Sequence, residues 1–359
     1  MKKTGMTMAL ALLLGTAMSG CAGNEQNAEK DGKLKVYTTI FPLQDFTKKI
    51  GGDAIEVESV YPANADAHTF EPTTKDMVDM AEADAFIYSG VGLEGFAEKA
   101  TETLQAEKVK IIKAGEGIEL ADSSHDETSD EEGHDEHTDE ETHDEHANEE
   151  GHDEHADEET HDEHANEEGH DEHADEEAHD EHEHGDKDPH IWLDPALSIQ
   201  IAENIKNGLS ELDPESKAVF EKNFKTLKAD LEALDADYKE TIETAGKKEI
   251  LVSHAAYGYW EERYGIEQIS VLGLSPTQEP SQKQLQSIIE TAKEHNMKYI
   301  IFENNVNSKI SDIVQAEIGA ESLTLSNLES ISEEDAKNSE DYFSLMKRNL
   351  ETLKTALSK

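Results

Sequence analysis

Two hydrophobic periodicities alternate along most of the chain. Short runs such as 33–40, 85–88 and 298–303 are rich in β-branched and aromatic residues and are no longer than a strand. Longer stretches follow them, in which apolar residues recur three and four positions apart, as they do in an amphipathic helix. Strands that alternate with helices in this way predict βαβ units and a parallel sheet.

The alternation occurs twice, once on each side of a long helical stretch. Strands are expected over residues 33–40, 54–61, 85–88, 109–112, 249–253, 268–272, 298–303 and 323–325, and helices over 41–50, 73–83, 93–104, 255–264, 282–295, 309–318 and 335–357. The predicted fold class is therefore α/β, with two lobes of parallel sheet flanked by helices. We place the lobes at 33–212 and 247–359, because each is long enough to hold its own core.

The stretch between the lobes predicts a single long helix over 213–246. Its apolar residues recur at spacings of four and three and so form one face: Phe220, Phe224, Leu227, Leu231, Leu234 and Tyr238. Asp213 and Pro214 are typical of a helix N-cap and first position, and Gly246 is expected to end the helix. An ordinary surface helix of one domain would show the same pattern, but its place between two sets of strands favours a helix that joins two lobes.

Residues 121–187 interrupt the first lobe with a sequence that cannot form a core. The segment contains no Leu, Ile, Val, Phe, Tyr or Trp, and between residues 134 and 182 the unit HDEH recurs every nine residues. We expect this tract to be disordered, because it buries too little apolar surface to offset the entropy of ordering. Histidines at a fixed spacing indicate metal binding, whereas a purely solubilising acidic spacer would need none.

The charge of the chain is concentrated in the same tract. Residues 121–190 hold 34 Asp or Glu against one Lys, which accounts for −33 of the formal net charge of −52. The remainder is only moderately acidic. A chain with this balance is not expected to bind nucleic acid, because it cannot neutralise phosphates.

The first residues predict a lipoprotein signal peptide over 1–20. Two lysines precede an apolar region, Met6–Leu14, that is too short to span a bilayer, and small residues lead to Cys21, the only cysteine of the chain. We expect lipid to be attached at Cys21 after cleavage, with residues 21–32 as a flexible tether. The mature protein would then lie outside the cytoplasm, anchored to the cell membrane.

Three histidines of the ordered sequence fall at predicted strand ends or in loops. His68 follows the second strand, His190 lies where ordered sequence resumes after the tract, and His254 follows the strand 249–253. Each could be an unrelated, hydrogen-bonded histidine, but their equivalent positions beside a metal-binding tract favour a shared site between the lobes. A carboxylate could complete a tetrahedral site, and both Glu303 and Glu329 lie at the ends of elements in the second lobe.

Four motifs carry a resemblance to a known family: Ala65–Pro72 (ADAHTFEP), Pro189–Pro195 (PHIWLDP), Ser253–Tyr257 (SHAAY), and Glu303 together with Leu328-Glu329. In these motifs the sequence from Lys33 to Lys359 resembles the metal-binding solute-binding lipoproteins of bacterial ABC importers, the zinc and manganese group. The order of the motifs and the acidic, His-rich insert before the second one also match that group.

The resemblance implies two α/β lobes joined by a rigid helix, with one metal ion in the cleft. It implies His68, His190 and His254 as three metal ligands and Glu329 as the fourth, with Glu303 as the runner-up. Manganese members of the family tend to carry glutamate at the position of His254, so this histidine favours Zn²⁺. Three imidazoles and a carboxylate also suit tetrahedral zinc better than a hard, oxygen-seeking ion.

The function implied is the extracytoplasmic, high-affinity binding of zinc for an ABC permease in the cytoplasmic membrane, with the tract capturing zinc. We expect a monomer. The alternatives are a manganese-binding importer component and a surface lipoprotein for metal buffering or cell adhesion. An enzyme is not expected, because the chain has no HExxH motif and four protein ligands leave no open position on the metal for an activated water.

Overall fold

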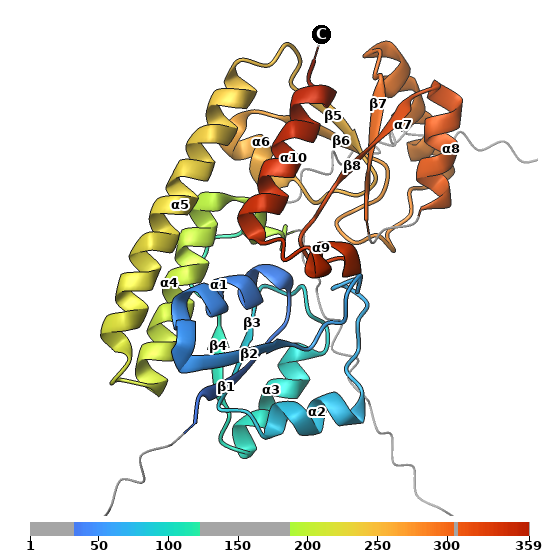
Figure 1. Ribbon diagram of the computed structural model, residues 1–359. Coiled ribbons are helices and arrows are strands. Elements are labelled where there is room, and N and C mark those ends of the chain that lie inside the picture. Colours follow the sequence, from blue (N-terminus) through green and yellow to red (C-terminus); the bar gives the residue numbers. More distant parts are fainter. Residues whose placement is uncertain (1–31, 123–186, 305–307, 359) are drawn as a thin grey trace, which may run out of the picture.

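The computed structural model describes residues 32–122, 187–304 and 308–358, and it contains two four-stranded sheets whose strands are all parallel. Each sheet is flanked by helices and forms one lobe (Figure 1). The predicted α/β class with two lobes is therefore confirmed. Four predicted features lie outside the described residues: the signal peptide, the lipid attachment at Cys21, the tether except its last residue, and nearly all of the His-rich tract.

The first sheet has the strand order β2-β1-β3-β4. Its strands are β1 (Leu34–Thr38), β2 (Ile55–Ser59), β3 (Ala85–Tyr88) and β4 (Lys110–Lys113), and its helices are α1 (Phe41–Gly51), α2 (Thr74–Ala81) and α3 (Ala97–Ala106), with a short 3₁₀ helix at Gly52–Ala54. The central strand β3 is buried at every position, as expected for a parallel strand covered on both faces.

The second sheet repeats the same arrangement, in the order β6-β5-β7-β8. Its strands are β5 (Glu249–Val252), β6 (Glu267–Ser270), β7 (Tyr299–Glu303) and β8 (Glu321–Leu325), and its helices are α6 (Gly258–Tyr264), α7 (Gln282–Glu294), α8 (Lys309–Ile318), α9 (Glu333–Lys337) and α10 (Tyr342–Ala356). In both sheets the strand order reverses beside the central strands, β1 and β3 or β5 and β7, which is where open α/β sheets bind ligands.

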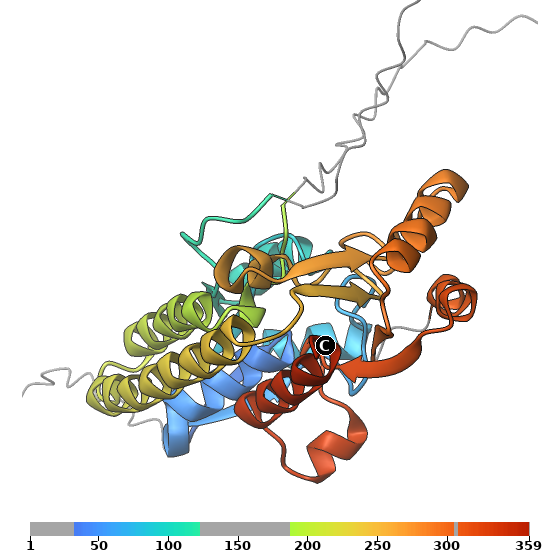
Figure 2. The ribbon, with the colours of Figure 1, turned by 90° about the horizontal axis from the view of Figure 1, so that it is seen from above.

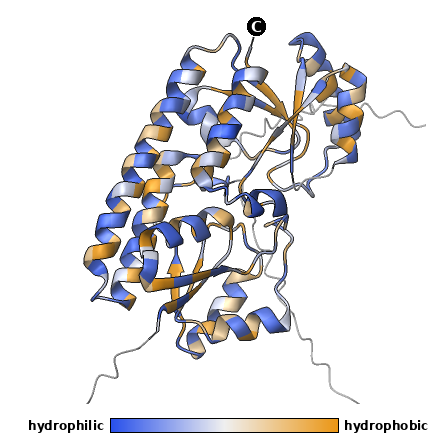
Figure 3. Ribbon diagram, in the orientation of Figure 1, coloured by the Kyte–Doolittle hydropathy of each residue, from blue (hydrophilic) through white to orange (hydrophobic). Residues whose placement is uncertain are grey.

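Between the lobes the chain forms a 3₁₀ turn at Ile191–Leu193 and two long helices, α4 (Pro195–Leu212) and α5 (Lys217–Glu243). The two helices pack side by side, and α10 lies next to α5 (Figures 1 and 2). Their apolar faces point inward, and their hydrophilic residues cover the outside (Figure 3). Among the described residues no helix combines the length and the apolar character that crossing a membrane requires.

The long helix begins four residues later than its predicted start at Asp213. The carboxylate of Asp213 accepts from the backbone N–H groups of Glu215 and Ser216 at 3.2 and 3.3 Å, so it caps a separate turn ahead of the helix. The sequence analysis also missed α4 altogether. Asp194 is the real N-cap of that helix: its side chain accepts from Ala196 N at 2.7 Å, and Pro195 follows at the first position.

Two predicted helices begin late because their first residues are used elsewhere. The helix predicted from 93 begins at Ala97, since the Glu94 side chain turns back to accept from the backbone N–H of Ser89 at 2.7 Å. The helix predicted from 255 begins at Gly258, since Ala255 N donates to Gly273 O at 3.0 Å. In both segments a contact with another element outweighs local helix preference.

The 3₁₀ turn joins the lobes through buried tryptophan hydrogen bonds. Trp192 Nε1 donates to Asn327 O at 2.7 Å, and Trp260 Nε1 donates to Leu193 O at 2.8 Å. Tyr342 Oη of α10 donates to Trp192 O at 2.8 Å. Because both tryptophans are fully buried, these bonds are shielded from water. They hold the turn against the second lobe, while α4, which follows the turn, packs on α1 and β4 of the first lobe.

The inward face of α5 gives a first prediction. Leu231 is fully buried, whereas Val219 on the same helix is 49% exposed. Leu231→Ala should lower the free energy of unfolding by about 2–5 kcal/mol, because it leaves a cavity in the core. Val219→Ala should change it by less than about 0.5 kcal/mol. Urea unfolding of the metal-free protein measures both values, and equal effects would contradict the assignment of the buried face.

Candidate metal centre

His68 lies in the loop that follows β2 in the first lobe. The loop is folded on itself: Asp66 accepts from His68 N at 3.0 Å and from Thr69 Oγ1 at 2.8 Å. Below it, Tyr61 Oη donates to Ala67 O at 3.3 Å. These bonds direct the imidazole toward the other lobe, and the His68 side chain stays 10% exposed.

His190 lies between the tract and the 3₁₀ turn, and it is fully buried. Asp188, two residues earlier, accepts from His190 N at 2.9 Å and lies 2.7 Å from Nδ1 of the same residue. Because a carboxylate only accepts, Nδ1 carries the proton and Nε2 presents its lone pair. Tyr259 of the second lobe donates to Asp188 O at 2.7 Å, so both lobes hold this segment.

His254 directly follows β5 and Ser253, and it is also fully buried. Its Nδ1 lies 2.6 Å from Oε2 of Glu303, which ends the neighbouring strand β7. The pairing has the same consequence as at His190: the carboxylate fixes the proton on Nδ1 and turns Nε2 into the space between the lobes.

Glu329 lies in the loop between β8 and α9, and its side chain is fully buried. The preceding residue, Leu328, has a φ of 59°, which a residue with a side chain rarely adopts. This turn brings Glu329 against the first lobe. Its backbone O accepts from Phe41 N at 3.0 Å, and its Oε2 accepts from Ala67 N at 3.1 Å, beside His68.

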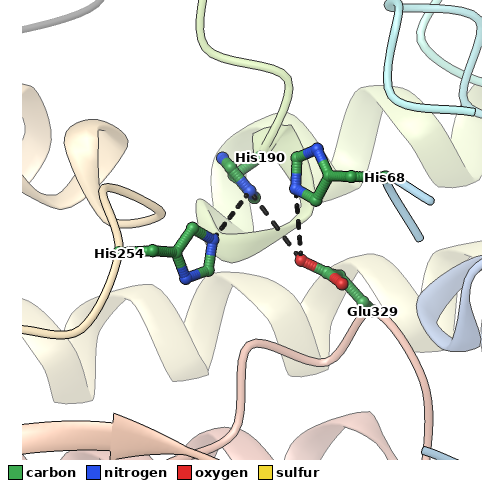
Figure 4. Close-up of side chains that lie close together, drawn as sticks. All are labelled: His68, His190, His254 and Glu329. Atoms are coloured by element: carbon green, nitrogen blue, oxygen red, sulfur yellow. Dashed lines mark hydrogen bonds and ion pairs between the residues drawn. The ribbon is translucent and has the colours of Figure 1, made fainter. Parts of the chain in front are cut away.

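These four side chains converge on one point between the lobes (Figure 4). One nitrogen or oxygen atom from each of His68, His190, His254 and Glu329 can be chosen so that all four lie within 4.8 Å of one another. The Nε2 atoms of His190 and His254 are 3.5 Å apart, and Oε1 of Glu329 lies 3.5 Å from Nε2 of His68 and 3.9 Å from Nε2 of His190.

The spacing matches a tetrahedral zinc site. Ligand atoms about 2.0–2.1 Å from a tetrahedral zinc ion lie about 3.3 Å from one another. Three of the separations, at 3.5 to 3.9 Å, are a few tenths of an ångström longer than this, and all of them are within 4.8 Å, so the four groups must draw together around an ion. Nε2 of His68 is buried without a hydrogen bond, 3.5 Å from Oε1 of Glu329, so a cation between the two atoms would give this nitrogen a partner. The donor set fits zinc.

The electrostatics of the site differ from one group to the next. Burial lowers the pKa of His190, although Asp188 opposes the shift. Burial acts in the same direction at His254, but there the Glu303 carboxylate outweighs it and the pKa is raised. Burial alone would raise the pKa of Glu329, yet the imidazoles of His68, His254 and His190 lower it to about 2. The carboxylate is therefore ionised and available to a metal.

The structure brings together the four residues that the sequence analysis placed in the site. Glu303, the runner-up for the fourth ligand, lies behind His254 and is not one of the four clustered groups. His295, outside the site, pairs with Glu249 at 2.7 Å with its side chain 38% exposed. The supporting role of Asp188 was not predicted from the sequence. Asp188 stands only two residues before His190, and at this separation its carboxylate can reach both the backbone N–H and the ring of that histidine.

Comparison with known proteins identifies the family. The family described as zinc-uptake complex component A, periplasmic, matches residues 36–356, and the chain belongs to it. The high-affinity zinc uptake system protein ZnuA of Bacillus subtilis is 34% identical over 357 residues, which cover 99% of this chain and 98% of that protein.

Two further similarities concern the zinc-binding lipoprotein AdcA of Streptococcus pneumoniae. It is 33% identical over 354 residues, 99% of this chain but 61% of that protein, so the chain spans about three fifths of its length. The crystal structure of its Zn(II)-bound ZnuA-like domain matches with a TM-score of 0.66 at 30% identity, over 91% of this chain and 100% of that domain.

The pKa shifts predict how zinc binding depends on pH. The pKa of His254 is raised above its usual 6.5, so a proton competes with zinc there at a higher pH than at free imidazole. Zinc affinity should be constant well above this pKa and should begin to fall while the pH is still above 6.5, by about tenfold per pH unit for each competing proton.

Two other groups set the shape of the curve. Because the pKa of His190 is lowered, a proton competes with zinc at His190 only below pH 6.5. Glu329, with a pKa of about 2, stays ionised throughout. Competition with a chelator, at less than one equivalent of zinc, measures the affinity from acidic to mildly alkaline pH. An affinity that first declines below pH 6.5 would contradict the raised pKa of His254.

Proposed function

We propose that the chain binds one Zn²⁺ ion through His68, His190, His254 and Glu329 and delivers it to a permease in the cytoplasmic membrane. The observation that carries this proposal is the convergence of three imidazoles, two of them fully buried, and one ionised, buried carboxylate within 4.8 Å of one another between two lobes. Membership of the zinc-uptake family supports it, and so does the similarity to ZnuA of Bacillus subtilis, which is named a high-affinity zinc uptake system protein.

The donor set favours zinc over manganese. Imidazole nitrogen is a good ligand for zinc, whereas manganese prefers sites rich in carboxylate, carbonyl and water oxygen. Three of the four proposed ligands are imidazoles. The two buried carboxylates behind them, Asp188 and Glu303, further increase the basicity of the nitrogen atoms that face the metal.

The same arrangement favours binding over catalysis. A catalytic zinc site has three protein ligands and keeps one position open for a water molecule, which a nearby base activates. Here four protein groups occupy a tetrahedron, and the carboxylate that could serve as a base, Glu329, is one of them. We therefore infer a transport protein and no enzymatic activity.

The location and assembly of the protein follow from its sequence and from its relatives. The similar AdcA protein is named a lipoprotein, in agreement with the signal peptide and lipid attachment at Cys21 proposed for this chain. We infer an extracytoplasmic monomer that the lipid anchors to the membrane beside its permease. The His-rich tract would capture zinc near the site, since residues 122 and 187 at its two ends lie next to Asp188.

Substitution of the ligands tests the site. His190→Ala should weaken zinc binding by more than about 100-fold, or about 2.7 kcal/mol, because it removes one bond and the tetrahedral geometry. Glu329→Ala should weaken it more than Glu303→Ala, because only Glu329 reaches the other three ligands. Chelator competition measures all three affinities.

The chain offers a suitable background for this test. Asp122 and Lys187 pair as an isolated antiparallel bridge, so residues 123–186 can be replaced by a two-residue Asn-Gly turn that keeps the two ends where they are. The shortened chain removes the zinc sites expected in the tract. If His190→Ala leaves tight binding unchanged in this background, the site assignment is wrong, and a greater loss from Glu303→Ala would move the fourth ligand to Glu303.

The tract itself gives a separate prediction. Deleting residues 123–186 should lower the number of zinc ions bound and slow loading at scarce zinc, while the affinity of the site between the lobes changes little. The physical reason is that tethered imidazoles and carboxylates raise the local zinc concentration but do not touch the buried ligands. Equilibrium dialysis counts the ions, and stopped-flow loading from a weak chelator gives the rate.

A matched variant separates capture from a spacer effect. Replacing every histidine of the tract by asparagine keeps its length and its formal charge with neutral histidine, and removes the imidazoles. Loading as slow as in the deletion variant would support capture by histidine. Loading as fast as in the parent chain would leave only the role of an acidic spacer.

A further inference from the structure

Glu303 is a buried carboxylate surrounded by hydrogen-bond donors. Besides Nδ1 of His254 at 2.6 Å, it accepts from Ser253 Oγ at 3.4 Å, from Tyr257 Oη at 3.4 Å and from Asn327 Nδ2 at 3.2 Å. These donors come from the segment after β5 and from the loop after β8. The side chain at the end of β7 thus connects the two second-lobe segments that carry proposed zinc ligands.

The chemistry of these contacts requires an acceptor at this position. An ionised carboxylate presents only acceptors, and all of its four neighbours donate to it. A carboxamide of the same size could present either its oxygen or its NH₂ group to Nδ1 of His254, because the hydroxyls of Ser253 and Tyr257 can accept as well as donate. Glu303 therefore fixes His254 as the tautomer with its proton on Nδ1 and its lone pair on Nε2, facing His190.

A second path leads from Glu303 to Glu329 through Asn327. The Asn327 side chain donates to Glu303 from Nδ2 and accepts from Glu329 N through Oδ1 at 3.2 Å. Its backbone O accepts from Trp192 Nε1. These bonds hold the residues on both sides of Leu328 in the turn with φ of 59°, the turn that aims Glu329 at the site.

We propose that Glu303 is the positioning residue for the second-lobe half of the zinc site, acting on His254 directly and on Glu329 through Asn327. The proposal rests on the proposed function and assigns Glu303 a role in affinity without contact with the metal. A role limited to the stability of the lobe is the alternative. The two differ in what they predict for the imidazole of His254 and for zinc affinity in the folded protein.

Glu303→Gln in the full-length chain tests the proposal with two measurements. Zinc affinity, from chelator competition at less than one equivalent of zinc, should fall by about 10- to 100-fold, the usual loss when a carboxylate behind a metal-bound histidine is removed. Nitrogen-15 spectra of the metal-free protein, at a pH where the imidazole is neutral, should report only the Nδ1–H tautomer of His254 in the parent and should show the Nε2–H tautomer beside it in the variant. The spectrum of His254→Ala assigns the signal.

Glu94→Gln provides a matched control in the first lobe. Glu94 is also a buried carboxylate, and it accepts from Thr39 Oγ1 and Ser89 N, each at 2.7 Å, just beyond strands β1 and β3. It occupies the corresponding place beside the central strands but contacts no proposed ligand. Glu94→Gln should lower the free energy of unfolding, as Glu303→Gln does, while zinc affinity and the tautomer of His254 stay as in the parent.

Asn327→Ala separates the path from Glu303 to Glu329 from the direct contact of Glu303 with His254. It also provides the test if Glu303→Gln does not fold. It removes the bond to Glu329 N but leaves His254 beside Glu303. Zinc affinity should fall by about tenfold, toward the lower end of the range for such supporting residues, with the tautomer of His254 unchanged.

Two outcomes would overturn the proposal. One is parent-like zinc affinity and tautomer in folded Glu303→Gln, and the other is parent-like affinity in Asn327→Ala. Either result, together with a large loss of affinity in His254→Ala, would reject the positioning role and leave the proposed function standing. Unchanged affinity in His254→Ala would instead reject the zinc site itself.

Discussion

The burial of three imidazoles and a carboxylate at the boundary between two lobes is the constraint on which the rest of the structure depends. Buried polar groups cost free energy unless hydrogen bonds or a metal satisfy them. His190 and His254 each meet a buried carboxylate, and Glu329 meets the Ala67 N–H of the opposite lobe. Because the ligands come from both lobes, the site requires lobes that are fixed relative to one another. The buried bonds of Trp192 to Asn327 and Tyr342 hold the 3₁₀ turn against the second lobe, and α4 directly after it packs on α1 and β4 of the first lobe.

The features of the fold that depend on local pattern could be predicted from the sequence. All eight strands were expected near their observed positions, because parallel strands covered on both faces are short runs rich in β-branched residues. Three of the proposed ligands were expected for a related reason. Parallel strands end at the same edge of a sheet, so His68 after β2, His254 after β5 and Glu329 after β8 fall at ligand-binding edges.

What the sequence did not reveal depends on contacts between distant segments. Asp194 and Asp213 both precede a proline, yet only Asp194 caps a helix, while Asp213 caps a turn. Nor could the local sequence rank Glu303 against Glu329, since both lie at the ends of elements in the second lobe. The difference arises from the left-handed turn at Leu328, which directs Glu329 across to the first lobe, and the bonds of Asn327 to Trp192, Glu303 and the backbone of Glu329 hold that turn.

Glu329 joins metal binding to the contact between the lobes. Its carboxylate is a proposed ligand, and the same carboxylate and its backbone O accept from Ala67 N and Phe41 N of the first lobe. Ser330 Oγ donates to Ala65 O beside it at 2.8 Å. A bound ion that draws Glu329 and His68 together therefore also strengthens the contact between the lobes. Linkage is reciprocal. If zinc makes the separation of these two segments less favourable by some factor, then a partner that separates them must lower the zinc affinity by that same factor.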